Sequence, residues 1–61
     1  MKYKVELFIK NNWIIHSWHK NEDFAIFNAE NISKGSKCDA RVVYKGDIVQ
    51  QFKGLQILKE I

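Results

Sequence analysis

Apolar and polar residues alternate over residues 2–10 (KYKVELFIK), near the start of the chain. Successive side chains of a β-strand point to opposite faces, so this period of two predicts a strand with one apolar face. That face carries Tyr3, Val5, Leu7 and Ile9. The opposite face carries Phe8 among the charged residues Lys2, Lys4, Glu6 and Lys10. A lone strand is not stable in water, so the rest of the chain must supply partner strands and a cover for the apolar face.

A second strand is predicted over residues 13–20 (WIIHSWHK). Asparagine tolerates the positive φ that a two-residue hairpin turn requires, so Asn11 and Asn12 are the predicted turn. This turn sets the register and places Phe8 opposite Ile15. The side chains predicted to share the first strand's apolar face are Ile14 and Trp18, while Trp13 and Ile15 join Phe8 on the other face.

A helix is predicted over residues 22–34, with Asn21 as its N-cap and acidic residues in its first turn. Gly35 is the predicted left-handed residue that ends the helix. The helical period turns one set of residues toward the sheet: Phe24, Ala25, Asn28, Ala29 and Ile32. Phe27 falls on the opposite side, which places a large apolar ring on the face of the helix that meets water.

A second hairpin is predicted from residues 37–44 (KCDARVVY) and 48–53 (IVQQFK), joined by a three-residue loop with glycine at its left-handed position. The predicted helix-facing residues are Cys38, Ala40, Val42, Ile48 and Phe52. The predicted residues of the other face are Asp39, Arg41, Val43, Val49 and Gln51. Residues 55–61 (LQILKEI) form a C-terminal tail with spacing typical of a short amphipathic helix.

These elements predict one α+β domain over residues 1–61, a ββαββ unit in which an antiparallel four-stranded sheet carries one helix on one face. The predicted core consists of Leu7, Ile14, Trp18, Phe24, Ala29, Ile32, Val42 and Phe52. A chain of 61 residues buries only roughly 60% of the surface that its unfolded form exposes, so its stability is small without further support. Its single cysteine excludes an internal disulfide bond, which leaves a metal or association as support.

Chemistry-bearing residues are few. His16 and His19 point to opposite faces of a regular strand and do not ligate one metal, and Cys38 lies on the predicted core face, where a thiol is inert. No glycine-rich phosphate loop and no motif with paired carboxylates occurs in the sequence. We therefore expect no catalytic residue, no metal and no cofactor, and no enzymatic activity.

The informative feature is the sheet face away from the helix, which gathers Phe8, Trp13, Ile15, Val43 and Val49 amid Lys4, Lys10, His19 and Arg41. Full burial of each large apolar side chain is worth roughly 1.5 to 3 kcal/mol, so this face favours a cover. Three covers remain open: the tail over residues 55–61, a second copy of the chain, or single-stranded nucleic acid stacked on the aromatic rings. In the last case the nucleic-acid contacts are Lys4, Lys10, His19 and Arg41.

The expected location is the cytoplasm. Lys2, Lys4 and Glu6 interrupt any apolar run, so neither a signal peptide nor a membrane span is predicted, and a lone cysteine suits a reducing compartment. The net charge of +3 comes from basic residues scattered along the chain, which argues against mimicry of DNA.

The succession YKVELFI, WIIHSW, NEDFAIFNAENI and RVVYKGDIVQQF, from Lys2 to Phe52, resembles the short ββαββ accessory proteins that bacteriophages encode. The resemblance implies a non-enzymatic factor that binds and inhibits a host protein, including components of antiviral defence, in the host cytoplasm. Phe8, Trp13, Phe27 and Arg41 are residue types common in such binding patches. We expect a protein-binding homodimer, with a single-stranded nucleic-acid-binding protein as the alternative.

Overall fold

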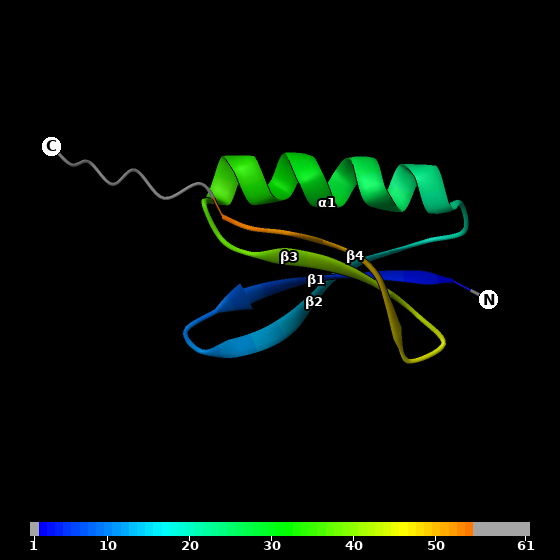
Figure 1. Ribbon diagram of the computed structural model, residues 1–61, viewed down its shortest axis with the longest axis horizontal. Helices are drawn as coiled ribbons and strands as arrows, with labels where there is room; N and C mark the ends of the chain where they lie inside the picture. The colour runs from blue at the N-terminus through cyan, green and yellow to red at the C-terminus, as the bar shows by residue number, and fades with distance from the viewer. Residues whose placement is uncertain (1, 55–61) are drawn as a thin grey trace, which may run out of the picture.

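One helix packs on one face of a four-stranded antiparallel sheet in the computed structural model of the protein, which describes residues 2–54 (Figure 1). The elements in chain order are β1 (Tyr3–Ile9), β2 (Asn12–His19), α1 (Glu22–Ser36), β3 (Ala40–Tyr44) and β4 (Asp47–Phe52). The strands lie in the order β2-β1-β3-β4, so the predicted α+β ββαββ fold is confirmed. The predicted tail or short helix over residues 55–61 lies outside the described residues. Over the described range, no helix is long and apolar enough to cross a membrane.

The first hairpin turns one residue earlier than predicted. Lys10 and Asn11 form the turn with φ angles of 52° and 67°, and Ile9 pairs with Asn12. Two consecutive positive φ angles give the turn whose twist matches that of the flanking strands. Moving the turn by one residue moves the register by two, so Phe8 lies opposite Trp13 and the predicted pairing with Ile15 is wrong. A shift of two preserves the faces, and the residues near the turn keep their predicted sides.

A β-bulge in β2 then exchanges the faces of the residues that follow it. Val5 pairs with Ser17 whereas Glu6 pairs with Ile15, so His16 is the extra residue. Beyond it, Trp18 lies opposite Lys4 on the face away from the helix, and 52% of its surface is exposed. The predicted core position of Trp18 is therefore wrong, because the bulge breaks the period of two on which that prediction rested.

The second hairpin also differs from the prediction in its turn and in a β-bulge. Its turn consists of Lys45 and Gly46, with φ angles of 53° and 83°, so it has two residues and not three. Val42 pairs with Gln50 but Val43 pairs with Ile48, which makes Val49 the extra residue of a bulge in β4. Val49 packs against the core and Ile48 joins Val43 on the other face, so the predicted sides of Ile48 and Val49 are exchanged.

Helix α1 begins as predicted and ends later. The Asn21 side-chain oxygen accepts a hydrogen bond from the Phe24 amide at 3.0 Å, which confirms the N-cap. The helix continues through Gly35, and Lys37 is the left-handed residue with φ of 61°. The buried hydroxyl of Ser33 lies 2.8 Å from the carbonyl oxygen of Cys38 and 3.2 Å from that of Lys53. These contacts fix where the chain leaves the helix, so the predicted end at Gly35 is wrong.

The core forms where small residues of α1 pack against β1 and β3. Ala25 and Ala29 are fully buried against Val5, Leu7, Ala40 and Val42. The predicted core residues Leu7, Ala29 and Val42 are buried, and Ile32 and Phe52 pack partly buried against them.

Phe24 and Ile14, also predicted in the core, are 64% and 45% exposed. The buried helix stripe is Ala25, Ala29 and Ser33, one residue every four, and this stripe turns Phe24 to the flank of the helix. Ile14 lies on the edge strand β2, which α1 contacts less than it contacts β1 and β3.

Candidate functional site

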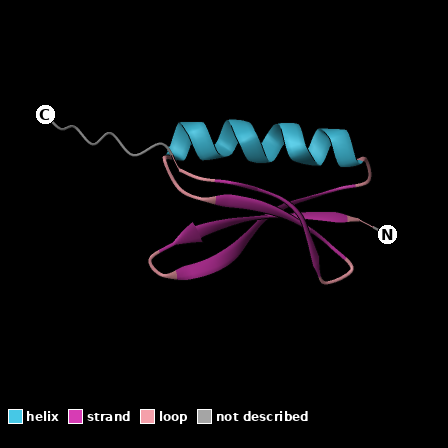
Figure 2. Cartoon of the chain, viewed as in Figure 1, coloured by secondary structure: helices cyan, strands magenta, loops and turns pink. Residues whose placement is uncertain are grey.

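The sheet face opposite α1, which we call the open face, is covered by none of the described elements (Figure 2). Its side chains form three rows across the strands, because paired residues of neighbouring strands share a face. The first row is Trp18, Lys4, Val43 and Ile48; the second is Ile15, Glu6, Arg41 and Gln51; the third is Trp13 and Phe8.

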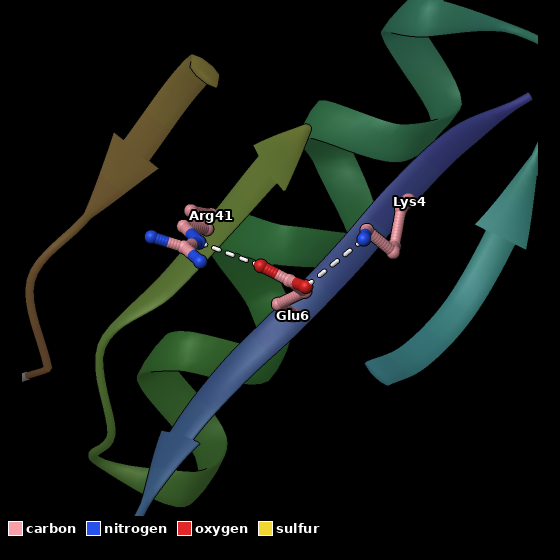
Figure 3. Close-up of polar contacts among 3 residues, drawn as sticks. All are labelled: Lys4, Glu6 and Arg41. Atoms are coloured by element: carbon pink, nitrogen blue, oxygen red, sulfur yellow. Dashed lines mark hydrogen bonds and ion pairs between the residues drawn. The ribbon is translucent and has the colours of Figure 1, made fainter. Parts of the chain in front are cut away.

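The centre of the open face is an ion network around Glu6, whose surface is only 7% exposed (Figure 3). Arg41 donates a hydrogen bond from Nε to Glu6 Oε1 at 2.6 Å, and Lys4 Nζ lies 3.2 Å from Glu6 Oε2. Both carboxylate oxygens therefore have a cationic partner, one from β3 and one from the same strand two residues away. Charge-assisted hydrogen bonds of this kind are short and strong.

The ion network lowers the pKa of the Glu6 carboxyl group. Burial alone raises the pKa of Glu6, but the hydrogen bonds and positive charges of Arg41 and Lys4 outweigh it, so the net pKa lies below the ordinary value. Glu6 is therefore ionised at neutral pH and the network carries one net positive charge.

Both tryptophans of the open face lie beside the cations of this network. The Arg41 guanidinium carbon is 4.0 Å from the centre of the Trp13 ring, and Lys4 Nζ is 5.7 Å from that of Trp18. Phe8 packs against Trp13 with ring centroids 5.0 Å apart and an interplanar angle of 51°. Arg41 is thus held by a carboxylate on one side and an aromatic ring on the other, so its orientation is set before any partner arrives.

The apolar area available for contact lies on the two edge strands. Ile15 and Trp18 of β2 and Ile48 of β4 are each 52% exposed, whereas Val43 between them is only 9% exposed. The open face therefore presents a charged centre flanked by apolar side chains. This arrangement differs from a uniformly apolar patch, because only the flanks gain by being covered.

Most of the residues predicted for this face lie on it. Phe8, Trp13, Ile15 and Val43 do, together with the cations Lys4 and Arg41. The other predicted members lie elsewhere: Val49 packs against the core, His19 pairs with Tyr3 on the helix side, and Lys10 is in the hairpin turn. Phe27, predicted on the side of the helix that meets water, is 62% exposed on α1. The bulges at His16 and Val49 account for two of these differences.

Trp18 and Ile48 were not predicted on this face, and Glu6 was placed on it by the alternation in residues 2–10 but was not predicted as a site residue. For Glu6 a signal exists, because Lys4 and Glu6 are two residues apart in a strand and so share a face as an opposite-charge pair. For Trp18 and Ile48 the sequence gives no such signal, because neither His16 nor Val49 is a residue type that indicates a bulge.

The bulge at His16 also changes the relation of the two histidines. His16 Nδ1 lies 3.1 Å and His19 Nε2 lies 2.9 Å from the hydroxyl oxygen of Ser17, so both rings converge on one side chain. The prediction that they point to opposite faces assumed a regular strand and is wrong. Between residues 2 and 54, no group of three or more histidine, cysteine, aspartate or glutamate side chains gathers in a way that suits a metal ion.

Comparison with known proteins adds nothing to this geometry, since no family model, curated protein or solved structure matches the chain. The open face is therefore the feature from which function is inferred.

Proposed function

We propose that the protein is a small non-enzymatic protein-binding factor and that the open face is its binding surface. The observation that carries this proposal is the pair of tryptophans with Arg41, held in place by the Glu6 network on an uncovered sheet face. Tryptophan and arginine are the residues that most often dominate the energy of protein interfaces.

Preorganisation supports the same proposal. A flexible arginine loses roughly 0.5 to 1.5 kcal/mol of conformational freedom when a partner immobilises it. Arg41 is already fixed by Glu6 and Trp13, so most of that cost falls on folding and not on binding. The exposed flanks at Ile15, Trp18 and Ile48 then supply apolar area around a fixed polar centre.

The charge of the network indicates the chemistry of the partner. Two copies placed open face to open face bring two positively charged centres together, which costs free energy in a desolvated interface. A partner with a carboxylate among apolar side chains meets no such repulsion. We propose that this partner is a host protein, including one of antiviral defence, as the resemblance to phage accessory proteins implies, and that the factor acts as a homodimer in the cytoplasm.

Single-stranded nucleic acid is the second candidate, because Trp13 and Trp18 lie beside Lys4 and Arg41 on one open sheet. The same geometry weakens it. Arg41 stacks on Trp13, so a base that stacks on that ring face must first displace the guanidinium. Binding of this kind falls steeply with salt, which provides a test.

The experiment compares substitutions at two residues of β2 that are similarly exposed but lie on opposite faces of the sheet. Trp18→Ser changes the open face and Ile14→Ser, at 45% against 52% exposure, changes the helix side. In bacteria that restrict a phage, expression of the wild type and of Ile14→Ser is expected to restore plating, and Trp18→Ser to restore it poorly. Equal rescue by both variants, or salt-sensitive binding of an oligothymidylate by the wild type, would contradict the proposal.

A further inference from the structure

Helix α1 carries the most exposed large apolar side chains of the described chain. Phe24 is 64% and Phe27 is 62% exposed, more than any open-face residue among the exposed large apolar side chains. They are three residues apart and so are neighbours on the helix surface. Phe27 lies opposite the buried stripe of Ala25, Ala29 and Ser33, and Phe24 lies outside that stripe, so most of the surface of both rings faces water.

The outward stripe of α1 has a heptad-like spacing. Asp23, Phe27, Glu30 and Lys34 follow each other at intervals of four, three and four residues, the spacing at which one helix meets another. Charge is divided along this stripe: Glu22 and Asp23 are in the first turn and Lys34 is in the last. Lys34 also lies 3.6 Å from Glu30 of its own helix, in an exposed pair that holds it on this side.

This division suits a second copy of the same helix in antiparallel orientation. A two-fold axis near the middle of the stripe, between residues 28 and 29, sets Asp23 of each copy opposite Lys34 of the other. The same axis sets Phe27 of each copy opposite Glu30 of the other, so the two Phe27 rings lie within one helical turn of each other on either side of the axis, and the helix dipoles also oppose each other favourably. A parallel arrangement would instead pair like charges at both ends.

The other surfaces are less suited to self-association. Both edge strands carry a β-bulge, at His16 in β2 and at Val49 in β4, and bulges interrupt the row of backbone groups that edge-to-edge pairing needs. The open face presents one net positive charge per copy at its centre.

We infer that α1 is a homodimer interface, formed by antiparallel packing of the Asp23–Phe27–Glu30–Lys34 stripe against the same stripe of a second copy, with Phe24 at its margin. This inference deepens the self-association in the proposed function and leaves the open face of each copy free for a target.

The first test is sedimentation over a range of protein concentrations with untagged protein. Phe27→Ser is expected to weaken dimerisation at least about tenfold, as loss of a central aromatic anchor does. Ile48→Ser, on the open face and 52% exposed, is the matched control and is expected to leave the dimer unchanged. Circular dichroism of each variant checks that the fold persists, which the exposure of both side chains favours.

The second test reverses charges. Asp23→Lys and Lys34→Asp are each expected to weaken the dimer about tenfold, because each sets like charges opposite across the interface. The double variant is expected to recover an affinity within a few-fold of the wild type. Loss of helix stability within each copy cannot produce this recovery, because each change alone places a charge unfavourably for the helix dipole and the two losses would add in the double variant.

A wild type that stays monomeric at every concentration overturns the inference, as does a dimer that Ile48→Ser dissociates and Phe27→Ser does not. A double charge variant weaker than either single variant overturns the antiparallel arrangement. None of these results bears on target binding by the open face, which the plating comparison of Trp18→Ser and Ile14→Ser decides separately.

Discussion

Replacement of Arg41 by methionine isolates the contribution of the ion network. The change keeps an apolar chain of similar reach beside Trp13 but removes the 2.6 Å hydrogen bond to Glu6, whose surface is 7% exposed. A hydrogen bond to a charged group contributes about 1.5 to 3 kcal/mol. Because the Arg41 side chain is 24% exposed and Lys4 still contacts the carboxylate, we expect a loss near the lower end, about 2 kcal/mol.

That loss is large for a domain of this size. Domains are stabilised by roughly 0.05 to 0.15 kcal/mol per residue, and in small domains each kcal/mol changes Tm by roughly 4 to 8 °C. Urea and thermal denaturation, followed by circular dichroism at a concentration where the wild type is monomeric, measure the difference. Lys34→Met is the control, because its pair with Glu30 is exposed on both sides and its loss costs less than about 0.5 kcal/mol.

The pH dependence supplies an internal check. The pKa of Glu6 is lowered in the folded protein, so its contribution is fully present above the unfolded-state pKa and is lost as pH falls through the folded-state pKa. In Arg41→Met only Lys4 still opposes the rise in pKa that burial causes, so the pKa of Glu6 increases. The stability difference between wild type and variant must therefore shrink toward acid pH. A difference that is the same at pH 7 and pH 3, or is no larger than that of Lys34→Met, would refute the role given to the network.

Four further substitutions test the backbone and capping geometry by urea denaturation. Gly54→Ala should destabilise the protein by about 1 to 3 kcal/mol, because a Cβ there would lie 2.5 Å from the Lys37 carbonyl oxygen. Gly35→Ala should stabilise it by about 0.5 to 1 kcal/mol, because no neighbouring segment lies within 4 Å of the added Cβ. A Gly35→Ala variant less stable than Gly54→Ala would show that the helix end is placed wrongly. Asn21→Ala should cost about 1 kcal/mol through loss of the bond to the Phe24 amide, and no loss would mean that this cap is not formed. Lys37→Gly should stabilise by about 0.5 to 1 kcal/mol, since the residue has φ of 61°, and a destabilised variant would argue against the left-handed end.

The elements of the fold were predictable because each has a local cause. The alternation in residues 2–10 encodes β1, Asn21 with two acidic residues encodes the start of α1, and Gly46 marks the second turn. The order β2-β1-β3-β4 has no such local signal, because it depends on contacts between distant segments.

The errors in the site arise from two inserted residues. His16 and Val49 are not unusual residue types for a strand, yet as the extra residues of bulges they reverse the faces of Trp18 and Ile48. A period of two carries no information on where it is interrupted, so the exposed tryptophan and isoleucine of the open face could not be assigned. Residues of β1 and β3, which have no extra residue, kept their predicted face, as Phe8 and Arg41 did.

Helix packing was mispredicted for a different reason. The predicted apolar arc, which has Phe24 at one end, carries larger side chains than the stripe of Ala25, Ala29 and Ser33, but the small stripe lets α1 approach β1 and β3 closely. Close approach of the whole helix outweighs burial of one ring. Phe24 is exposed as a consequence, whereas the exposure of Phe27 was predicted from the helical period.

Site-specific photo-crosslinking in host cells tests most directly whether the open face binds a protein partner. A benzophenone side chain replaces Trp18 or Ile48 on the open face, or Ile14 on the helix side of the sheet as the control. We expect the two open-face positions to crosslink to one and the same host protein, and the product to disappear when Arg41→Met is added. Crosslinks to nucleic acid, or the same host protein captured equally from Ile14, would contradict the assignment of the open face as the binding surface.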